Sequence, residues 1–188
     1  SLNNIPVLLD EAFIDYNPES SLVSLTTSVP QFVVLRSLTK FYAMPGLRVG
    51  YAVCNAKLAA NIRRQIESWP VSSVGLAAGR AALVEDGYES HSRQVNAESR
   101  EEFASALCNI GVTVFPSAAN FLLVRLPHGS GADLARYLEA ERILIRRCES
   151  FLGLSDEYLR LAVLSARDNL RLVSSIAEWL KTVPPISK

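Results

Sequence analysis

Three short apolar runs near the start of the chain constrain its fold more than any other feature. They occupy residues 5–9, 32–35 and 49–53. Runs of this length without polar alternation are typical of strands buried on both faces of a sheet. The connections between them are too long for hairpins, which favours parallel pairing. The first half of the chain therefore predicts an α/β layer architecture with a parallel sheet.

The rest of the chain alternates between helical and strand patterns. Val95, Phe103, Leu107 and Ile110 would lie on one face of a long helix that ends at Gly111. Gly87 would cap the helix before it. The expected helices cover residues 22–26, 56–67, 72–86, 88–110, 132–141 and 168–180, and the remaining expected strands cover 112–115, 120–124, 143–145 and 158–163. The second half is thus expected to form a small α+β unit, which we predict can fold by itself.

Charge and composition exclude several classes of protein. Nineteen Lys and Arg balance nineteen Asp and Glu, whereas a nucleic-acid binder needs a basic excess for phosphate contacts. No apolar run approaches the roughly 20 residues that span a bilayer, and the first residues lack a signal-peptide pattern. Three dispersed cysteines and two histidines form no metal-ligand cluster. These observations predict a cytoplasmic globular protein without a metal, and without a nucleic-acid or membrane partner.

One segment carries the residue types of a phosphate-binding and nucleophilic site. Lys40 follows the second apolar run, with Ser37 and Thr39 before it and Arg48 eight residues later. Open α/β sheets place their ligands at the carboxyl ends of strands. Hydroxyls and a guanidinium suit a phosphate, and the lysine amine can form a Schiff base with an aldehyde. Taken alone, Lys40 or Arg48 is better explained as a solvated surface charge.

The whole segment, however, resembles the lysine loop of fold-type I pyridoxal-phosphate enzymes of the aminotransferase superfamily. The matching pattern is hydroxyl, any residue, hydroxyl, Lys, and later Pro-Gly-Leu-Arg-x-Gly. The resemblance implies that Lys40 is catalytic and attaches pyridoxal 5'-phosphate covalently. It also implies that Ser37, Thr39 and Arg48 bind the cofactor phosphate.

A second segment agrees with this resemblance. Asp10 ends the first apolar run, where a buried carboxylate is costly unless it is paired. In the family an aspartate here pairs with the protonated pyridine nitrogen and keeps the ring an electron sink. Alone, Asp10 would be explained as a helix cap or turn residue. Phe13 departs from the tyrosine frequent in the family, so the cofactor contact of that hydroxyl must be absent or come from another group.

Three residues of the second half match substrate-binding positions of the family. Arg146 and Arg160 would clamp the carboxylate or phosphate of the substrate, because guanidinium binds such anions in bidentate fashion. Asn120 matches a segment close to the substrate, and a turn-capping role explains it equally well. For Arg147 we expect only a solvated guanidinium on an edge strand.

Two branches of the superfamily compete for the activity. Residues 10–15, 35–43 and 142–148 look most like threonine-phosphate decarboxylase of cobalamin biosynthesis, and next like histidinol-phosphate aminotransferase. The first reading implies decarboxylation of O-phospho-L-threonine to an aminopropanol phosphate. The second implies amino-group transfer. A non-catalytic binding module that kept the lysine loop is an alternative of another class.

The resemblance covers only the carboxy-terminal half of a typical family member. It implies a partial, mostly parallel sheet of the large cofactor-binding domain over residues 1–95 and a small α+β domain over 96–188. We therefore expect this polypeptide to be a fragment, inactive by itself, of an enzyme that works as a homodimer. The first half is also expected to expose apolar strand edges.

Overall fold

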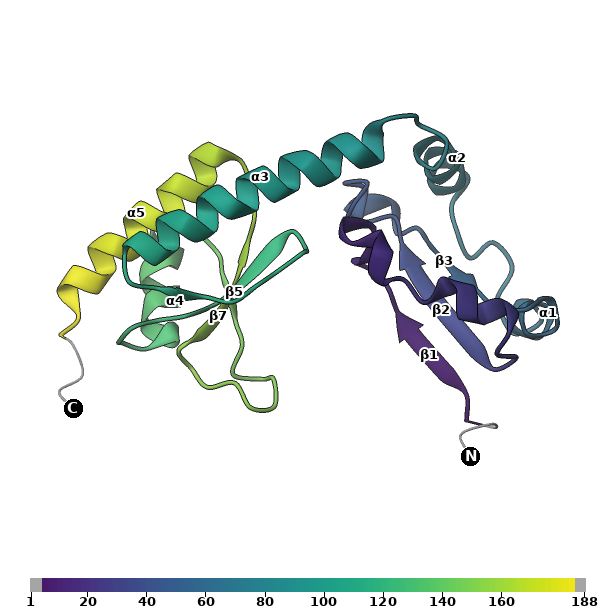
Figure 1. Cartoon of the computed structure of the whole chain (residues 1–188), viewed down its shortest axis with the longest axis horizontal. Helices are drawn as coiled ribbons and strands as arrows, with labels where there is room; N and C mark the ends of the chain where they lie inside the picture. Colours follow the sequence, from purple (N-terminus) through teal and green to yellow (C-terminus); the bar gives the residue numbers. More distant parts are fainter. Residues whose placement is uncertain (1–4, 185–188) are drawn as a thin grey trace. The chain divides into compact units, whose positions relative to one another are not determined.

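The computed structural model describes residues 5–184, and the chain divides into two units, Ser1–Ser92 and Arg93–Lys188. The division falls within the long helix α3 (Tyr88–Asn109). Figure 1 shows a sheet in each unit, with helices packed beside it. Within the described residues, no helix combines the length and apolar character needed to cross a membrane.

The sheet of the first unit contains β1 (Val7–Asp10), β2 (Phe32–Ser37) and β3 (Gly50–Val53) in that spatial order. β1 and β2 pair in parallel, as predicted. β2 and β3 pair antiparallel, so the expectation of parallel pairing was wrong for the third strand.

A compact loop explains the antiparallel third strand. Between β2 and β3 the chain makes turns and the short 3₁₀ helix η4 (Pro45–Leu47), not a crossover helix. The backbone N–H of Leu38 donates to the carbonyl of Val49 at 3.1 Å, which closes the loop at its base. A connection of this length can therefore return beside its own strand when its apolar residues pack together, and chain length alone does not decide the direction.

Short helices fill the remainder of the first unit. η1 (Ile14–Tyr16), η2 (Pro18–Ser20) and η3 (Val23–Thr27) connect β1 to β2, and α1 (Ala56–Arg63) and α2 (Ser73–Ala82) follow β3. Both α-helices begin at a side-chain cap. Leu58 N–H donates to Asn55 Oδ1 at the start of α1, and Gly75 N–H donates to Ser72 Oγ at the start of α2.

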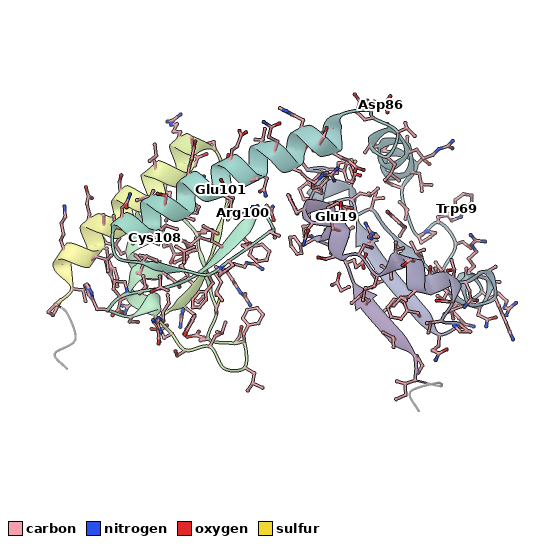
Figure 2. The ribbon with its side chains drawn as sticks, in the orientation of Figure 1. Glu19, Trp69, Asp86, Arg100, Glu101 and Cys108 are labelled. Atoms are coloured by element: carbon pink, nitrogen blue, oxygen red, sulfur yellow. The ribbon has the colours of Figure 1, made fainter. Side chains whose placement is uncertain are left out.

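Both α-helices of this unit end four residues earlier than predicted. Leu83 caps α2, so Gly87 does not; instead the Gly87 carbonyl accepts from His91 N–H in the first turn of α3. Trp69 lies in the connection between α1 and α2, where its side chain is 93% exposed (Figure 2).

The second unit is a four-stranded antiparallel sheet covered by helices. Helices α3 and α5 lie side by side along it (Figure 1). Phe103 and Leu107 of α3 share one apolar core with Leu172 and Ile176 of α5. The elements are β4 (Thr113–Val114), β5 (Phe121–Arg125), α4 (Gly131–Ala140), β6 (Arg146–Arg147), β7 (Tyr158–Ala162) and α5 (Ala166–Thr182), with strand order β4-β5-β7-β6.

Two expectations for this unit were wrong. Residues 143–145 form no strand, because Arg142 has a left-handed backbone and Ile143 N–H donates to Leu138 O at 2.8 Å, which closes the end of α4. The strand begins only at Arg146. Val95 is 46% exposed and does not share the buried face of Phe103 and Leu107.

Candidate functional site

A cavity of about 460 Å³ lies at the ends of the strands of the first unit. The five predicted cofactor-binding residues all line it: Asp10, Ser37, Thr39, Lys40 and Arg48. They come from the carboxyl ends of β1 and β2 and from the loop that leads to β3. The fold therefore brings two segments about 30 residues apart in the chain to one cavity.

Lys40 and the two hydroxyls form one hydrogen-bonded group. The Oγ of Ser37 and the Oγ1 of Thr39 are 2.7 Å apart, and the Lys40 ammonium donates to Thr39 Oγ1 at 3.0 Å. The Lys40 nitrogen lies 6.0 Å from the centre of the Phe13 ring. Thr39 is buried and Lys40 is exposed, so the amine is accessible while its partner is fixed.

Apolar neighbours hold the lysine loop in place. Leu38, Phe41, Tyr42 and Val49 are buried in one cluster. Because the residues on either side of Thr39–Lys40 are anchored in this cluster, the loop presents Lys40 to solvent on a fixed support.

Two glycines of α2 let that helix approach the loop. A Cβ on Gly75 would lie 2.8 Å from Val49 Cγ2, and a Cβ on Gly79 would lie 3.0 Å from Leu38 Cδ1. Both distances are shorter than ordinary van der Waals contact, so larger residues would push α2 away from the loop.

Arg48 and Asp10 reach the cavity in different ways. Arg48 adopts a left-handed backbone (φ 51°), uncommon for a residue other than glycine, and its guanidinium donates to the Pro45 carbonyl at 3.4 Å. Asp10 accepts a hydrogen bond from the backbone N–H of Ala12 at 2.9 Å. The expectation of a buried Asp10 was wrong, because its side chain faces the open cavity at the end of a strand and is exposed.

Sequence reasoning missed a buried ionic network beside these residues. Arg36 lies 2.9 Å from Glu11 and 2.9 Å from Asp15. Arg36 also lines the cavity. The available signal was a charge directly after an apolar strand run, which is costly unless an opposite charge lies nearby.

Tyr51 is a further cavity residue that the sequence did not indicate. It lies opposite Arg36 in the pairing of β2 and β3. Burial raises the pKa of the Tyr51 phenol, and the Arg36 guanidinium lowers it in part. Its hydroxyl therefore stays protonated at neutral pH and can donate a hydrogen bond in the cavity.

The residues of the cavity fit pyridoxal 5'-phosphate by the chemistry of their groups. Ser37, Thr39 and Arg48 would hold the phosphate, Asp10 would hold the protonated ring nitrogen, and Lys40 would attach the aldehyde carbon. Among the described residues, no group of three or more His, Cys, Asp or Glu side chains could hold a metal ion.

The predicted substrate arginines lie in the second unit. Arg146 and Arg160 are opposite each other in the pairing of β6 and β7, and both are exposed. Arg160 lies 5.0 Å from the ring centre of Phe121, and Arg146 lies 5.9 Å from that of Phe151. Two directly paired arginines thus each place their guanidinium over an aromatic ring.

The remaining two predicted positions also have defined surroundings. Asn120 precedes β5, and its carbonyl accepts from Val163 N–H at 2.9 Å. Arg100 of α3, which is labelled in Figure 2, donates to Ala118 O, two residues before Asn120. Arg147 is not a free surface charge as expected, because it pairs with Asp156 at 3.4 Å and with Glu149.

Comparisons with known proteins show which family the chain belongs to. The sequence matches the family model of aminotransferase class I and II over residues 2–176. Threonine-phosphate decarboxylase of Salmonella typhimurium is 40% identical over 97% of this chain and 50% of its own length. Histidinol-phosphate aminotransferase of Aromatoleum aromaticum is 34% identical over 88% of this chain and 49% of its own length.

A solved structure shares the arrangement of elements. Histidinol-phosphate aminotransferase from Clostridium acetobutylicum matches with a TM-score of 0.88 at 32% identity, over 95% of this chain and 55% of that one. The chain spans about half the length of the curated relatives it matches. The match of the family model over most of the chain is decisive: the chain belongs to the aminotransferase class I and II family, enzymes whose cofactor is pyridoxal 5'-phosphate.

Proposed function

We propose that the protein carrying this chain decarboxylates O-phospho-L-threonine to an aminopropanol phosphate, a step of cobalamin biosynthesis. The observation that supports this choice is the similarity to the Salmonella typhimurium threonine-phosphate decarboxylase. That similarity extends over more of the chain and at higher identity than the one to the Aromatoleum aromaticum aminotransferase. The names of both relatives refer to phosphorylated compounds, so a phosphorylated substrate is common to the two candidate functions.

Different cavity residues bind the cofactor and transfer the proton. Bound pyridoxal phosphate supplies an electron sink for the Cα of an amino substrate. Asp10 keeps the ring nitrogen protonated, and Ser37, Thr39 and Arg48 hold the phosphate. Lys40 would hold the aldehyde carbon of the cofactor, and its amine would deliver to the substrate Cα the proton that replaces the carboxylate lost as CO₂.

The arginines of the second unit determine which bond breaks. The bond on Cα that is aligned with the electron sink is the one cleaved, so the anion clamps choose the reaction by orienting the substrate. Arg146 and Arg160 together can hold two anionic groups, which suits a phosphorylated amino acid. Asn120 is proposed to contact the substrate as well.

One assay decides between the two reactions. The natural-length protein with pyridoxal phosphate is incubated with O-phospho-L-threonine, and CO₂ release is measured. In parallel, keto-acid formation is measured from histidinol phosphate and 2-oxoglutarate. CO₂ release without amino exchange supports the proposal, and amino exchange without CO₂ overturns it.

Amino-group transfer is the second candidate. The observation in its favour is the high structural similarity to the Clostridium acetobutylicum histidinol-phosphate aminotransferase. We further propose that the protein acts in the cytoplasm as a homodimer. The 188 residues alone are expected to be inactive, because the active relatives are about twice as long.

A further inference from the structure

Two residues that adjoin the cofactor residues in the sequence form a buried ion pair. The Nε of Arg36 lies 2.9 Å from the Oε2 of Glu11, and their side chains are 13% and 3% exposed. Glu11 directly follows Asp10, and Arg36 directly precedes Ser37. The pair therefore connects the end of β1 to the end of β2 at the point where each strand delivers its cavity residues.

Hydrogen bonds fix the carboxylate of this pair. The Oε1 of Glu11 accepts from the backbone N–H of Leu22 at 2.7 Å, and its Oε2 accepts from the Ser21 hydroxyl at 2.9 Å. A buried carboxylate is stable only with such partners, so any displacement of Glu11 breaks several bonds at once. Both carboxylate oxygens of Glu11, the residue after Asp10, are thus held by hydrogen bonds.

The guanidinium of Arg36 makes contacts that a lysine cannot reproduce. Besides Glu11, it reaches Asp15 Oδ1 with one terminal nitrogen and the Ser21 hydroxyl with the other, both at 2.9 Å. A planar fork with several donors can serve two carboxylates and a hydroxyl, whereas an ammonium group is a single point charge. The position therefore requires arginine for geometry and not only for charge.

Asp10 and Lys40 are themselves exposed, so they need rigid neighbours to keep a fixed separation. We propose that Arg36 and Glu11 are positioning residues whose ion pair holds Asp10 at the distance from Lys40 that pyridoxal phosphate requires. The inference rests on the proposed cofactor site but is independent of which reaction follows.

The test compares cofactor affinity with fold stability in the natural-length protein. The variants are Arg36→Lys, Arg36→Met, Glu11→Gln and the double variant Glu11→Gln/Arg36→Met. Arg147→Lys is the matched control, since Arg147 also pairs with carboxylates but belongs to the second unit. Absorbance titration measures the dissociation constant of pyridoxal phosphate, and the thermal midpoint of the cofactor-free protein reports folding.

We expect Arg36→Lys to fold and to bind the cofactor at least tenfold more weakly than the wild type, whereas Arg147→Lys binds as the wild type does. The double variant should lose no more affinity than the worse single variant, because the two residues act as one unit. A purely structural role would lower the thermal midpoint and leave the dissociation constant unchanged in folded protein.

Three outcomes distinguish failure of the inference from failure of the proposed function. A folded Arg36→Lys protein whose dissociation constant stays within twofold of the wild type overturns the positioning role. Additive losses in the double variant also overturn it. A wild-type protein that binds no pyridoxal phosphate overturns the proposed cofactor site itself.

Discussion

Arg146 of β6 lies directly opposite Arg160 of β7 in an antiparallel pair. Like charges in directly opposed positions destabilise a sheet, by up to about 1 kcal/mol. Stacking on Phe151 and Phe121 offsets part of this repulsion. An anion bound between the two guanidiniums would remove the remaining repulsion. This is the physical reason to expect an anion site at the Arg146–Arg160 pair.

The first prediction concerns this repulsion. Arg160→Gln should raise the thermal midpoint of the substrate-free protein slightly, by the equivalent of less than about 1 kcal/mol, because it removes one of two opposed charges but also the contact of Arg160 with Phe121. The same change should raise KM for the phosphorylated amino acid about tenfold or more, since charged hydrogen bonds contribute about 1.5–3 kcal/mol. Arg125→Gln, an exposed arginine of the neighbouring strand β5, serves as the control and should change neither. An unchanged KM in Arg160→Gln would remove Arg160 from the substrate site.

The second prediction concerns covalent attachment of the cofactor. Borohydride reduction of the natural-length protein with pyridoxal phosphate should label the peptide that contains Lys40, and Lys40→Ala should abolish the label. Lys57→Ala is the control, because Lys57 is also exposed but lies on α1, outside the residues that line the cavity. Mass spectrometry of the digested protein locates the adduct. A label retained in Lys40→Ala would exclude this lysine from the role.

The third prediction concerns acid stability of the second unit. The Ser130 hydroxyl donates to Asp156, and together with the Ala132 N–H and the Arg147 guanidinium it holds the pKa of that carboxyl below its ordinary value, against the opposing effect of burial. A carboxyl whose pKa is lower in the folded protein than in the unfolded chain stabilises the folded state at every pH above its unfolded-chain pKa of about 3.9. This contribution is lost as the pH falls through the pKa of the carboxyl in the folded protein.

Asp156→Asn should therefore lower the thermal midpoint at pH 7 by the equivalent of about 1 kcal/mol, and the difference from the wild type should shrink below about pH 4. Asp133→Asn is the control, because Asp133 is an exposed aspartate in the first turn of α4, the helix that Ser130 caps. A difference that stays constant from pH 7 to pH 3 would show that the charge of Asp156 is not the cause.

Local pattern was enough to place most helices and the lysine loop. Ser37, Thr39 and Lys40 are contiguous with a strand end, so strand geometry alone brings them to one edge. The direction of β3 was not accessible in this way, because it depends on how Leu38 and Val49 close the loop between the strands. Tertiary packing of that loop outweighs the usual relation between connection length and strand direction.

The buried network was missed for a similar reason. Glu11 and Arg36 are 25 positions apart, and the family resemblance of their segments assigned no role to either residue. Only the parallel register of β1 and β2 places Asp10 beside Leu35 and so makes the neighbouring residues partners. A charge inside an apolar strand signals that some partner exists, but not which one.

The fourth prediction concerns the cofactor phosphate. Arg48→Ala should weaken pyridoxal phosphate binding by about 1.5–3 kcal/mol, or roughly 10- to 150-fold, through loss of a charge-assisted contact. Arg48→Asn is the backbone control, because asparagine tolerates the left-handed conformation found at this position better than alanine does. Both variants should lose affinity equally if the guanidinium matters. Recovery of affinity in Arg48→Asn alone would assign the effect to backbone strain.

The last prediction concerns the first strand. β1 lies at the edge of the sheet that the described strands of the first unit form, and Leu8 on it is 67% exposed. An exposed apolar edge strand is a template for pairing with another chain. The 188-residue polypeptide produced by itself should therefore self-associate, and light scattering coupled to size-exclusion chromatography should report a mass above that of the monomer.

Leu8→Lys should shift the same polypeptide toward the monomer, because a charge on an edge strand opposes strand pairing. Val84→Lys is the matched control, since Val84 is also an exposed aliphatic residue but follows α2, outside the strand. It should leave the association unchanged. If the unchanged polypeptide is a monodisperse monomer, β1 does not pair with another chain. Leu8 would then be an ordinary exposed surface residue.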